Sequence, residues 1–218
     1  MCKMLVPICI VLAIASVGYA SVGDICPFTG KVVQEVIGNW EGTGQDAGWS
    51  CINGSDYAIG TRGATLGSQT LDLYTGNWTF WELQYDFQTI ESFAGVTLCM
   101  NVSTYVDEIV GNWTDIGKIK IWSDGATGYL EVTPTVGIIS GTDGGTDWGD
   151  WNGDSQRAFM WDLSSFDTTG ATYISIAFSF NAGEVGPFHV DNVELCCPEP
   201  ATMALLGLGG LALIRRKK

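Results

Sequence analysis

Short β-rich runs, separated by Gly, Asn and Asp, fill the chain between residues 21 and 196, and helical periodicity is hard to find there. This pattern is typical of an all-β protein. In residues 173–180 apolar and smaller or polar side chains alternate strictly, so one face of that strand is expected to pack on a core. We expect ten strands, at residues 31–37, 57–61, 70–74, 80–89, 95–101, 118–123, 129–133, 158–162, 173–181 and 187–195. Such strands fit a two-sheet antiparallel β-sandwich, or jelly roll.

Residues 1–20 have the features of a secretory signal peptide. Lys3 supplies the positive start, residues 5–17 are mostly apolar, and Gly18 and Ala20 are small residues at the positions that a signal peptidase recognises. We expect cleavage after Ala20. The alternative is an uncleaved membrane anchor, but the apolar run is shorter than the roughly 20 residues that span a bilayer.

The C-terminal segment, residues 197–218, combines three features in order. Pro198, Glu199 and Pro200 come first, an apolar stretch covers residues 201–214, and four basic residues end the chain. The basic end would stay on the cytoplasmic side of a membrane. The segment therefore indicates a stop-transfer tail with a short transmembrane helix and a cleavable hinge, and the alternative is a chance apolar helix.

This tail, PEPATMALLGLGGLALIRRKK, resembles the PEP-CTERM sorting signal of exported bacterial proteins. The resemblance implies processing near Pro198, Glu199 and Pro200 by a membrane-embedded transpeptidase of the exosortase type. It also implies an exported protein, held briefly in the membrane by its C-terminal helix and then delivered to the cell surface or to extracellular polysaccharide. The membrane would be contacted only through the sorting tail.

The body between the two end segments, residues 21–196, is strongly acidic. Five of the ten basic residues and one of the 24 acidic residues lie in the end segments, which leaves the body with a net charge of −18. Such a field repels nucleic acid and anionic lipid, and it attracts divalent cations. Nucleic acid is therefore excluded as a partner.

Five cysteines remain after signal cleavage: Cys26, Cys51, Cys99, Cys196 and Cys197. Export makes disulfides plausible, and a jelly roll brings its first and last strands together. We therefore expect Cys26 to pair with Cys196 or Cys197, and on weaker grounds Cys51 with Cys99. An odd number leaves at least one thiol free or paired between molecules. Because no CxxC pair with a partner set occurs, a zinc site is not expected.

Four segments of the body resemble, in order, those of calcium-binding jelly-roll carbohydrate-binding modules: NWEGTGQDAGW, GSQTLDL, WELQYDF and FHVDNVEL. The resemblance implies a galactose-binding-like sandwich with a structural Ca²⁺ where the first and last strands meet. Glu41 and Asp191 are then the expected acidic ligands, and Ca²⁺ takes six to eight oxygens. Alternatively, Glu41 is a solvated turn residue and Asp191 ends a strand.

A second acidic segment, residues 141–154, is rich in Asp and Gly. Asp150, Asn152 and Asp154 alternate as in an EF-hand loop, but Ser155 replaces the required Gly and Trp161 stands where the bidentate carboxylate belongs. We reject that motif and expect a solvated loop, with a looser calcium site as the alternative.

All nine tryptophans lie in the body. Indole rings stack on the C–H faces of sugars, and nearby carboxylates and amides bind the hydroxyl groups. Trp49, Trp81 and Trp161 are expected in the core. The candidates for exposed sugar platforms lie in a polar segment or near strand ends: Trp113, Trp122, Trp148 and Trp151.

Catalytic motifs are missing from the sequence. The single histidine, His189, lies in an expected strand near Asp191, and no nucleophile elbow, P-loop or HExxH motif occurs. We therefore expect no enzyme, but a non-catalytic binder of carbohydrate or exopolysaccharide. The alternatives are a structural or adhesive coat protein without a sugar site, and a jelly-roll glycosidase or polysaccharide lyase.

Overall fold

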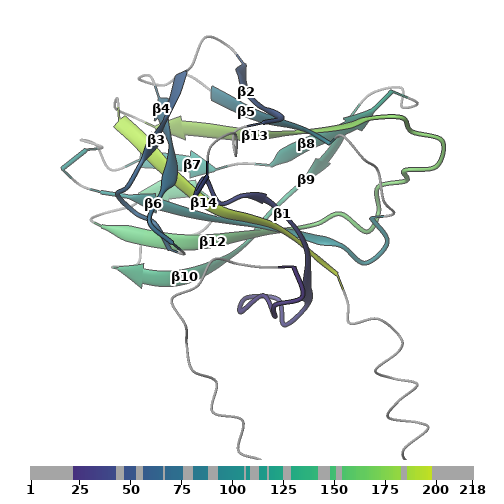
Figure 1. The fold of residues 1–218 in the computed structure, drawn as a ribbon. Coiled ribbons are helices and arrows are strands. Elements are labelled where there is room, and N and C mark those ends of the chain that lie inside the picture. The colour runs from purple at the N-terminus through teal and green to yellow at the C-terminus, as the bar shows by residue number, and fades with distance from the viewer. Residues whose placement is uncertain are drawn as a thin grey trace, which may run out of the picture.

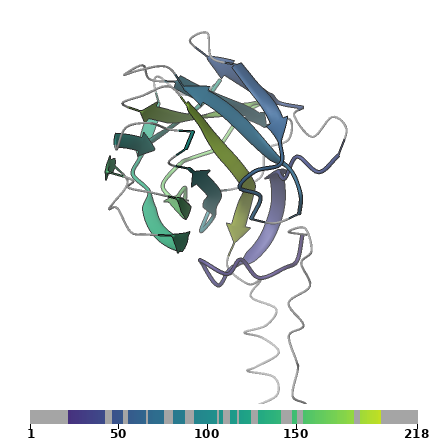
Figure 2. The same ribbon diagram turned by 90° about the vertical axis from the view of Figure 1, so that its left-hand side faces the viewer.

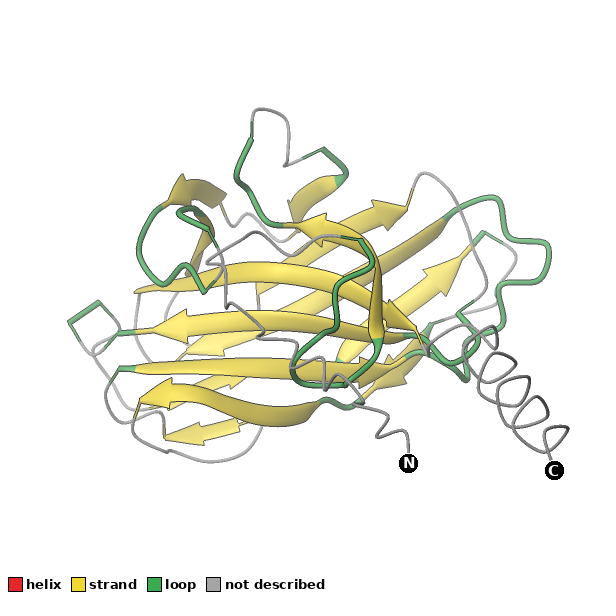
Figure 3. Cartoon of the chain, turned by 60° about the horizontal axis from the view of Figure 1, so that its bottom comes forward, coloured by secondary structure: helices red, strands yellow, loops and turns green. Residues whose placement is uncertain are grey.

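The computed structural model describes residues 22–42, 47–52, 56–65, 67–75, 81–87, 93–105, 107–108, 113–116, 118–124, 129–141, 148–150, 154–182 and 186–197. Every regular element among these residues is a strand, and the strands form two antiparallel sheets (Figures 1 and 3). The expected all-β sandwich is therefore confirmed. No helix in the described part of the chain is long and apolar enough to cross a bilayer.

The first sheet, called sheet A, is built around the last strand of the body. Its order is β10 (Thr135–Gly141), β12 (Ser155–Asp162), β6 (Thr97–Thr104), β14 (Gly186–Cys197), β4 (Thr70–Thr75) and β3 (Asp56–Gly60). The long β14 pairs with β4 along its first half and with β1 (Val32–Gly38) along its second half. The first and last strands therefore lie side by side, as expected for a jelly roll (Figure 1).

The second sheet, sheet B, is built around β13 (Ile174–Ala182) and lies across the core from sheet A (Figure 2). Its order is β11 (Trp148–Asp150), β7 (Trp113–Ile116), β13, β5 (Trp81–Phe87) and β2 (Trp49–Ile52). A further strand, β8 (Ile119–Ser123), pairs with the first part of β13 and with β9 (Leu130–Val132). Two strands, β7 and β8, thus share one side of β13.

The core between the sheets follows the alternation seen in the sequence. Ile174, Ile176, Phe178 and Phe180 of β13 are fully buried in one apolar cluster. Burying side chains of this size stabilises the fold by about 1.5–3 kcal/mol each. Trp49 and Trp161 are buried as predicted, whereas the side chain of Trp81 lies outside the described residues.

Trp40 is a further core residue that was not predicted. It is 1% exposed, its indole Nε1 donates to the carbonyl of Val190 at 2.8 Å, and its φ of 56° lies in the left-handed region. Its ring packs so closely on Gly38 that a Cβ there would lie 2.6 Å from the indole. Gly38 is therefore required for the tryptophan to cover the end of β1.

All ten expected strands are present, but four others were missed: β2, β7, β10 and β11. β2 and β7 are four residues long, β11 is three residues long, and β10 contains two glycines, so none carries a long alternating pattern. The prediction of a solvated loop over residues 141–154 is wrong in part, because Trp148–Asp150 form β11 and pair with β7.

Candidate functional site

A hollow of about 440 Å³ opens on the outer face of sheet B, the face turned away from the core. Side chains from three neighbouring strands and from the segment before β13 surround it. The lining residues are Gln84, Asp86, Phe87, Trp122, Thr172, Tyr173 and Ser175. We call this hollow the Trp122 groove.

The strand register explains why these side chains meet. Ser175 of β13 lies directly opposite Trp122 of β8 on one side and opposite Asp86 of β5 on the other. In β8, Ile119 and Ile121 are buried in the core. Alternation therefore turns Trp122 to the outer face, in a row with Ser175 and Asp86.

The floor of the groove is low because small residues occupy the central strand. Ser175 and Ala177 face outward from β13 but are only 3% and 1% exposed. The larger side chains of the flanking strands shelter them. Trp122 thus stands as a wall beside a shallow floor instead of lying on a flat sheet.

A carboxylate is held in place on the wall opposite Trp122. Asp86 Oδ1 accepts hydrogen bonds from Ser175 Oγ at 2.5 Å and from Gln84 Nε2 at 2.7 Å. Both donors come from the sheet, so the position of the carboxylate is fixed by rigid strands. An oriented carboxylate and amide of this kind can bind vicinal hydroxyl groups.

The rim of the groove is formed by Thr172 and Tyr173, which are tied to the end of β8 by Asp124. Asp124 Oδ1 accepts from the Thr172 amide at 2.8 Å and from the Tyr173 amide at 3.4 Å, and Oδ2 accepts from Thr172 Oγ1. These hydrogen bonds from Thr172 lower the pKa of Asp124. Tyr173 is 46% exposed, so its ring is available to a ligand.

Of the four tryptophans predicted as sugar platforms, the structure describes the side chain of one. Trp122 lines the groove. Trp113 of β7 lies opposite Asp150, and Trp148 of β11 lies opposite Asp115, on the neighbouring edge of sheet B, but their side chains lie outside the described residues. Trp151 is also outside the described residues.

Sequence reasoning predicted Trp122 but missed the other six lining residues, among them Gln84, Asp86 and Tyr173. The signal for the first two was present, because Leu83 and Phe87 alternate with them in β5 and point into the core. The register that aligns β5 with β13 could not be derived from that pattern.

The two expected calcium ligands hold the same loop, residues 61–69, although they come from different parts of the chain. Glu41 accepts from the Ser68 amide, from Ser68 Oγ at 2.9 Å and from the Gln69 amide at 2.6 Å. Asp191 is fully buried, and its Oδ2 accepts from the Thr65 amide at 2.7 Å and from Thr65 Oγ1 at 2.8 Å.

Two amide oxygens near Asp191 are buried without a hydrogen-bond partner. Asn101, which is paired with Asp191 across β6 and β14, donates through Nδ2 to Thr65, but its Oδ1 has no donor. Asn192 Oδ1 is also buried without a hydrogen-bond donor. Asn192 lies at a bulge in β14, where its φ is 49°. Carboxylate and amide oxygens are the ligands that Ca²⁺ prefers, so this donor set fits the ion.

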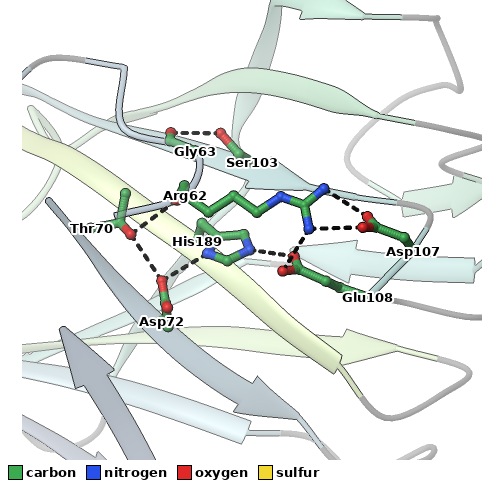
Figure 4. A network of polar contacts seen from close by, with 8 residues as sticks. All are labelled: Arg62, Gly63, Thr70, Asp72, Ser103, Asp107, Glu108 and His189. Atoms are coloured by element: carbon green, nitrogen blue, oxygen red, sulfur yellow. Dashed lines mark hydrogen bonds and ion pairs between the residues drawn. The ribbon is translucent and has the colours of Figure 1, made fainter. Parts of the chain in front are cut away.

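His189 lies between two carboxylates on the outer face of sheet A (Figure 4). Nδ1 faces Asp72 Oδ1 and Nε2 faces Glu108 Oε2, both at 2.7 Å, and Glu108 also pairs with Arg62. Burial acts against the charged ring, but these hydrogen bonds raise the pKa of His189. The network joins β14, β4 and two loops, and its partners satisfy both ring nitrogens.

Three cysteines come together on the outer side of sheet A: Cys26, Cys99 and Cys196. Cys26 is thus close to Cys196 as expected, but the three cysteines of the cluster are not joined by a disulfide. The pairing of Cys51 with Cys99 is wrong. Cys99 faces away from the core between the sheets, since Leu98 and Met100 point into it, whereas Cys51 of sheet B packs against that core.

The C-terminal residues 197–218 match the PEP-CTERM protein-sorting motif. This motif marks the chain as an exported protein with a C-terminal sorting tail. No curated protein sequence matches the chain.

Several solved structures with a similar fold are carbohydrate-binding modules. One is a module of the β-sandwich superfamily with promiscuous specificity, which has 14% identity over 75% of this chain and 64% of that chain, with a TM-score of 0.50. The CBM22-1 xylan-binding domain from Paenibacillus barcinonensis has 11% identity over 77% of this chain and 97% of that chain, with a TM-score of 0.49. The family 11 module from Clostridium thermocellum, in complex with a mixed-linked tetrasaccharide, has 16% identity over 75% and 95%, with a TM-score of 0.45. At these identities the likeness concerns the sandwich fold.

Proposed function

We propose that the mature protein binds extracellular polysaccharide, without cleaving it, in the Trp122 groove. The observation that carries the proposal is the arrangement of that groove: an indole wall and an exposed tyrosine rim flank a fixed carboxylate and amide. Aromatic faces stack on the C–H faces of sugar rings, while the polar pair binds their hydroxyl groups.

The charge of the groove favours a neutral polysaccharide. Asp86 is the only charged side chain among the described lining residues. The body as a whole carries a net charge of −18. A uronate-rich chain would therefore be repelled at the groove and by the surrounding field.

The place of action follows from the sorting tail. We propose that an exosortase-type transpeptidase processes the chain near Pro198, Glu199 and Pro200 after signal peptidase has cut behind Ala20. The body then remains at the cell surface or in the extracellular matrix, where the polysaccharide ligand is found. Its acidity keeps it soluble there.

We also propose that Ca²⁺ stabilises the fold through Asp191 and Glu41. The support is the pair of buried, unsatisfied amide oxygens of Asn101 and Asn192 beside a fully buried carboxylate. In this role the ion would fasten the loop of residues 61–69 to β14.

The proposed function is tested by glycan binding with purified mature protein. Calorimetry with neutral glucans, xylans and mannans, and with a uronate polymer as the acidic comparison, should give binding to a neutral polymer only. Tyr173→Ala should weaken that binding, whereas Tyr74→Ala, an equally exposed tyrosine on sheet A, should not. Loss in both variants, or release of reducing ends from any polymer, would contradict the proposal. Self-association without glycan binding would favour a coat protein.

A further inference from the structure

The cysteine cluster on sheet A is built from three distant parts of the chain. Cys26 lies before β1, Cys99 in β6 and Cys196 near the end of β14, and each is at most 1% exposed. The Sγ atoms of Cys26 and Cys99 are 3.6 Å apart, and those of Cys99 and Cys196 are 3.9 Å apart. All three sulfurs lie within 4.8 Å of one another.

These separations match the edges of a zinc–thiolate tetrahedron. With Zn–S bonds of about 2.3 Å and tetrahedral angles, two ligand sulfurs are about 3.8 Å apart. Three sulfurs that all lie within 4.8 Å of one another can share one ion, whereas a disulfide would join only two of them.

A buried carboxylate beside the cluster gives independent evidence that a cation belongs there. Glu194 is 1% exposed, and its Oε2 lies 3.8 Å from Cys196 Sγ. Among the described residues no ion pair to Glu194 is present. An ionised carboxylate is costly in such surroundings unless a positive charge compensates it.

Zinc binds cysteine as the thiolate, so the three thiols would release their protons on binding the ion.

We propose that Cys26, Cys99 and Cys196 bind a structural Zn²⁺ ion, with Glu194 as the fourth ligand after a rotation of its side chain. The sequence predicted no zinc site because it has no CxxC pair, but the sandwich assembles the ligands from separate strands. The ion ties the segment before β1 to β6 and β14. Cys196 directly precedes the sorting motif, so the site fastens the sandwich at the point where the tail leaves it.

The test is metal analysis of the mature protein, refolded with Zn²⁺ under reducing conditions. We expect one zinc per chain in the wild type, and tetrahedral thiolate bands when Co²⁺ replaces zinc. Removing the metal with a strong chelator should lower Tm by about 5 °C or more. Cys26→Ser and Cys99→Ser should lose the metal, whereas the control variants Cys51→Ser and Cys197→Ser should retain it.

The cobalt spectrum and the chelator experiment use the wild-type chain, so they hold even if a cluster variant fails to fold. Wild-type protein without stoichiometric zinc and without cobalt–thiolate bands would overturn the proposal. A disulfide between two of the three cysteines, found by non-reducing peptide mapping of protein secreted by its host, would do the same. Glycan binding does not depend on this outcome, because the Trp122 groove lies on the other sheet.

Discussion

Trp122 lies directly opposite Ser175 on the neighbouring strands β8 and β13. The largest side chain type thus stands beside one of the smallest, and the step between them forms the wall of the groove. Ser175 is in turn opposite Asp86, to which its hydroxyl donates. One row across sheet B therefore supplies an aromatic face, a floor and a fixed carboxylate. A sugar ring can stack its C–H face on the indole in this arrangement and direct its hydroxyl groups toward Asp86.

Replacing Trp122 by alanine should abolish most of the glycan affinity. The indole is the wall on which the sugar stacks, and truncating a central aromatic contact commonly costs about 2 kcal/mol or more, or more than about tenfold in Kd. Calorimetry with the neutral polysaccharide found for the wild type measures the change. Trp122→Phe is the matched control, because it keeps an aromatic face. An alanine variant that binds as tightly as the wild type would remove the groove from consideration.

Asp124 should control the groove through its rim. Asp124→Ala removes the hydrogen bonds to Thr172 and Tyr173, so we expect about a three- to tenfold weaker Kd, in the range of one typical net hydrogen bond. The control is Asp167→Ala, since Asp167 caps Thr169 in another loop in the same way, through an Oδ1–amide distance of 2.9 Å. Equal effects of the two variants would show that the rim has no part in binding.

The same residue predicts an acid limit for binding. Hydrogen bonds from Thr172 hold the pKa of Asp124 below its ordinary value of 3.8. A carboxylate with a depressed folded pKa stabilises the fold above its unfolded pKa, and this contribution is lost as the pH falls through the folded pKa. The rim should therefore stay ordered from neutral pH down to about pH 4 and loosen below it. Below about pH 4 the glycan affinity should fall less in the Asp124→Asn variant than in the wild type.

The sequence indicated as much of the groove as a single strand can reveal. Polar and apolar side chains alternate over residues 118–121, so the side chain of Trp122 was expected to point to the face opposite Ile119 and Ile121. The contribution of Asp86 and Tyr173 depends on which strands become neighbours and in which register. That choice is made by long-range pairing of β5, β8 and β13, which local alternation does not encode.

The cysteine cluster was beyond sequence reasoning for a related reason. In β6 apolar and polar side chains alternate, so Cys99 is expected to face away from the core, but this pattern does not show which side chains it meets there. Only the pairing of β6 with β14 brings Cys99 next to Cys196, with Cys99 opposite Glu194 in the register. The proximity of Cys26 to Cys196 was predicted correctly, because a jelly roll places its first and last strands side by side.

Calcium should raise the thermal stability of the protein through Asp191. At an ion concentration of about 100 times Kd, binding to the folded state alone adds about 2.7 kcal/mol, which corresponds to a Tm rise on the order of 5–10 °C. Asp191→Asn should abolish this rise, while Asp56→Asn at the exposed start of β3 should leave it intact. Thermal unfolding with and without added Ca²⁺, in a calcium-free buffer that contains no chelator, measures the rise within each variant. No rise in the wild type would remove the calcium site.

His189 should contribute more to stability than the exposed arginine of the same network. His189→Gln removes the imidazole between Asp72 and Glu108; Glu108 keeps its pair with Arg62, but Asp72, at 13% exposure, loses its charged partner. We expect a loss of about 2 kcal/mol in the free energy of unfolding, since one partner of a buried charged group has been removed. Arg62→Ala breaks pairs in which Arg62 and Asp107 are 40% and 64% exposed, so it should cost less than His189→Gln. Urea unfolding of both variants measures the difference. A larger loss for Arg62→Ala would mean that the exposed ion pairs of Arg62, and not the buried imidazole of His189, stabilise the network.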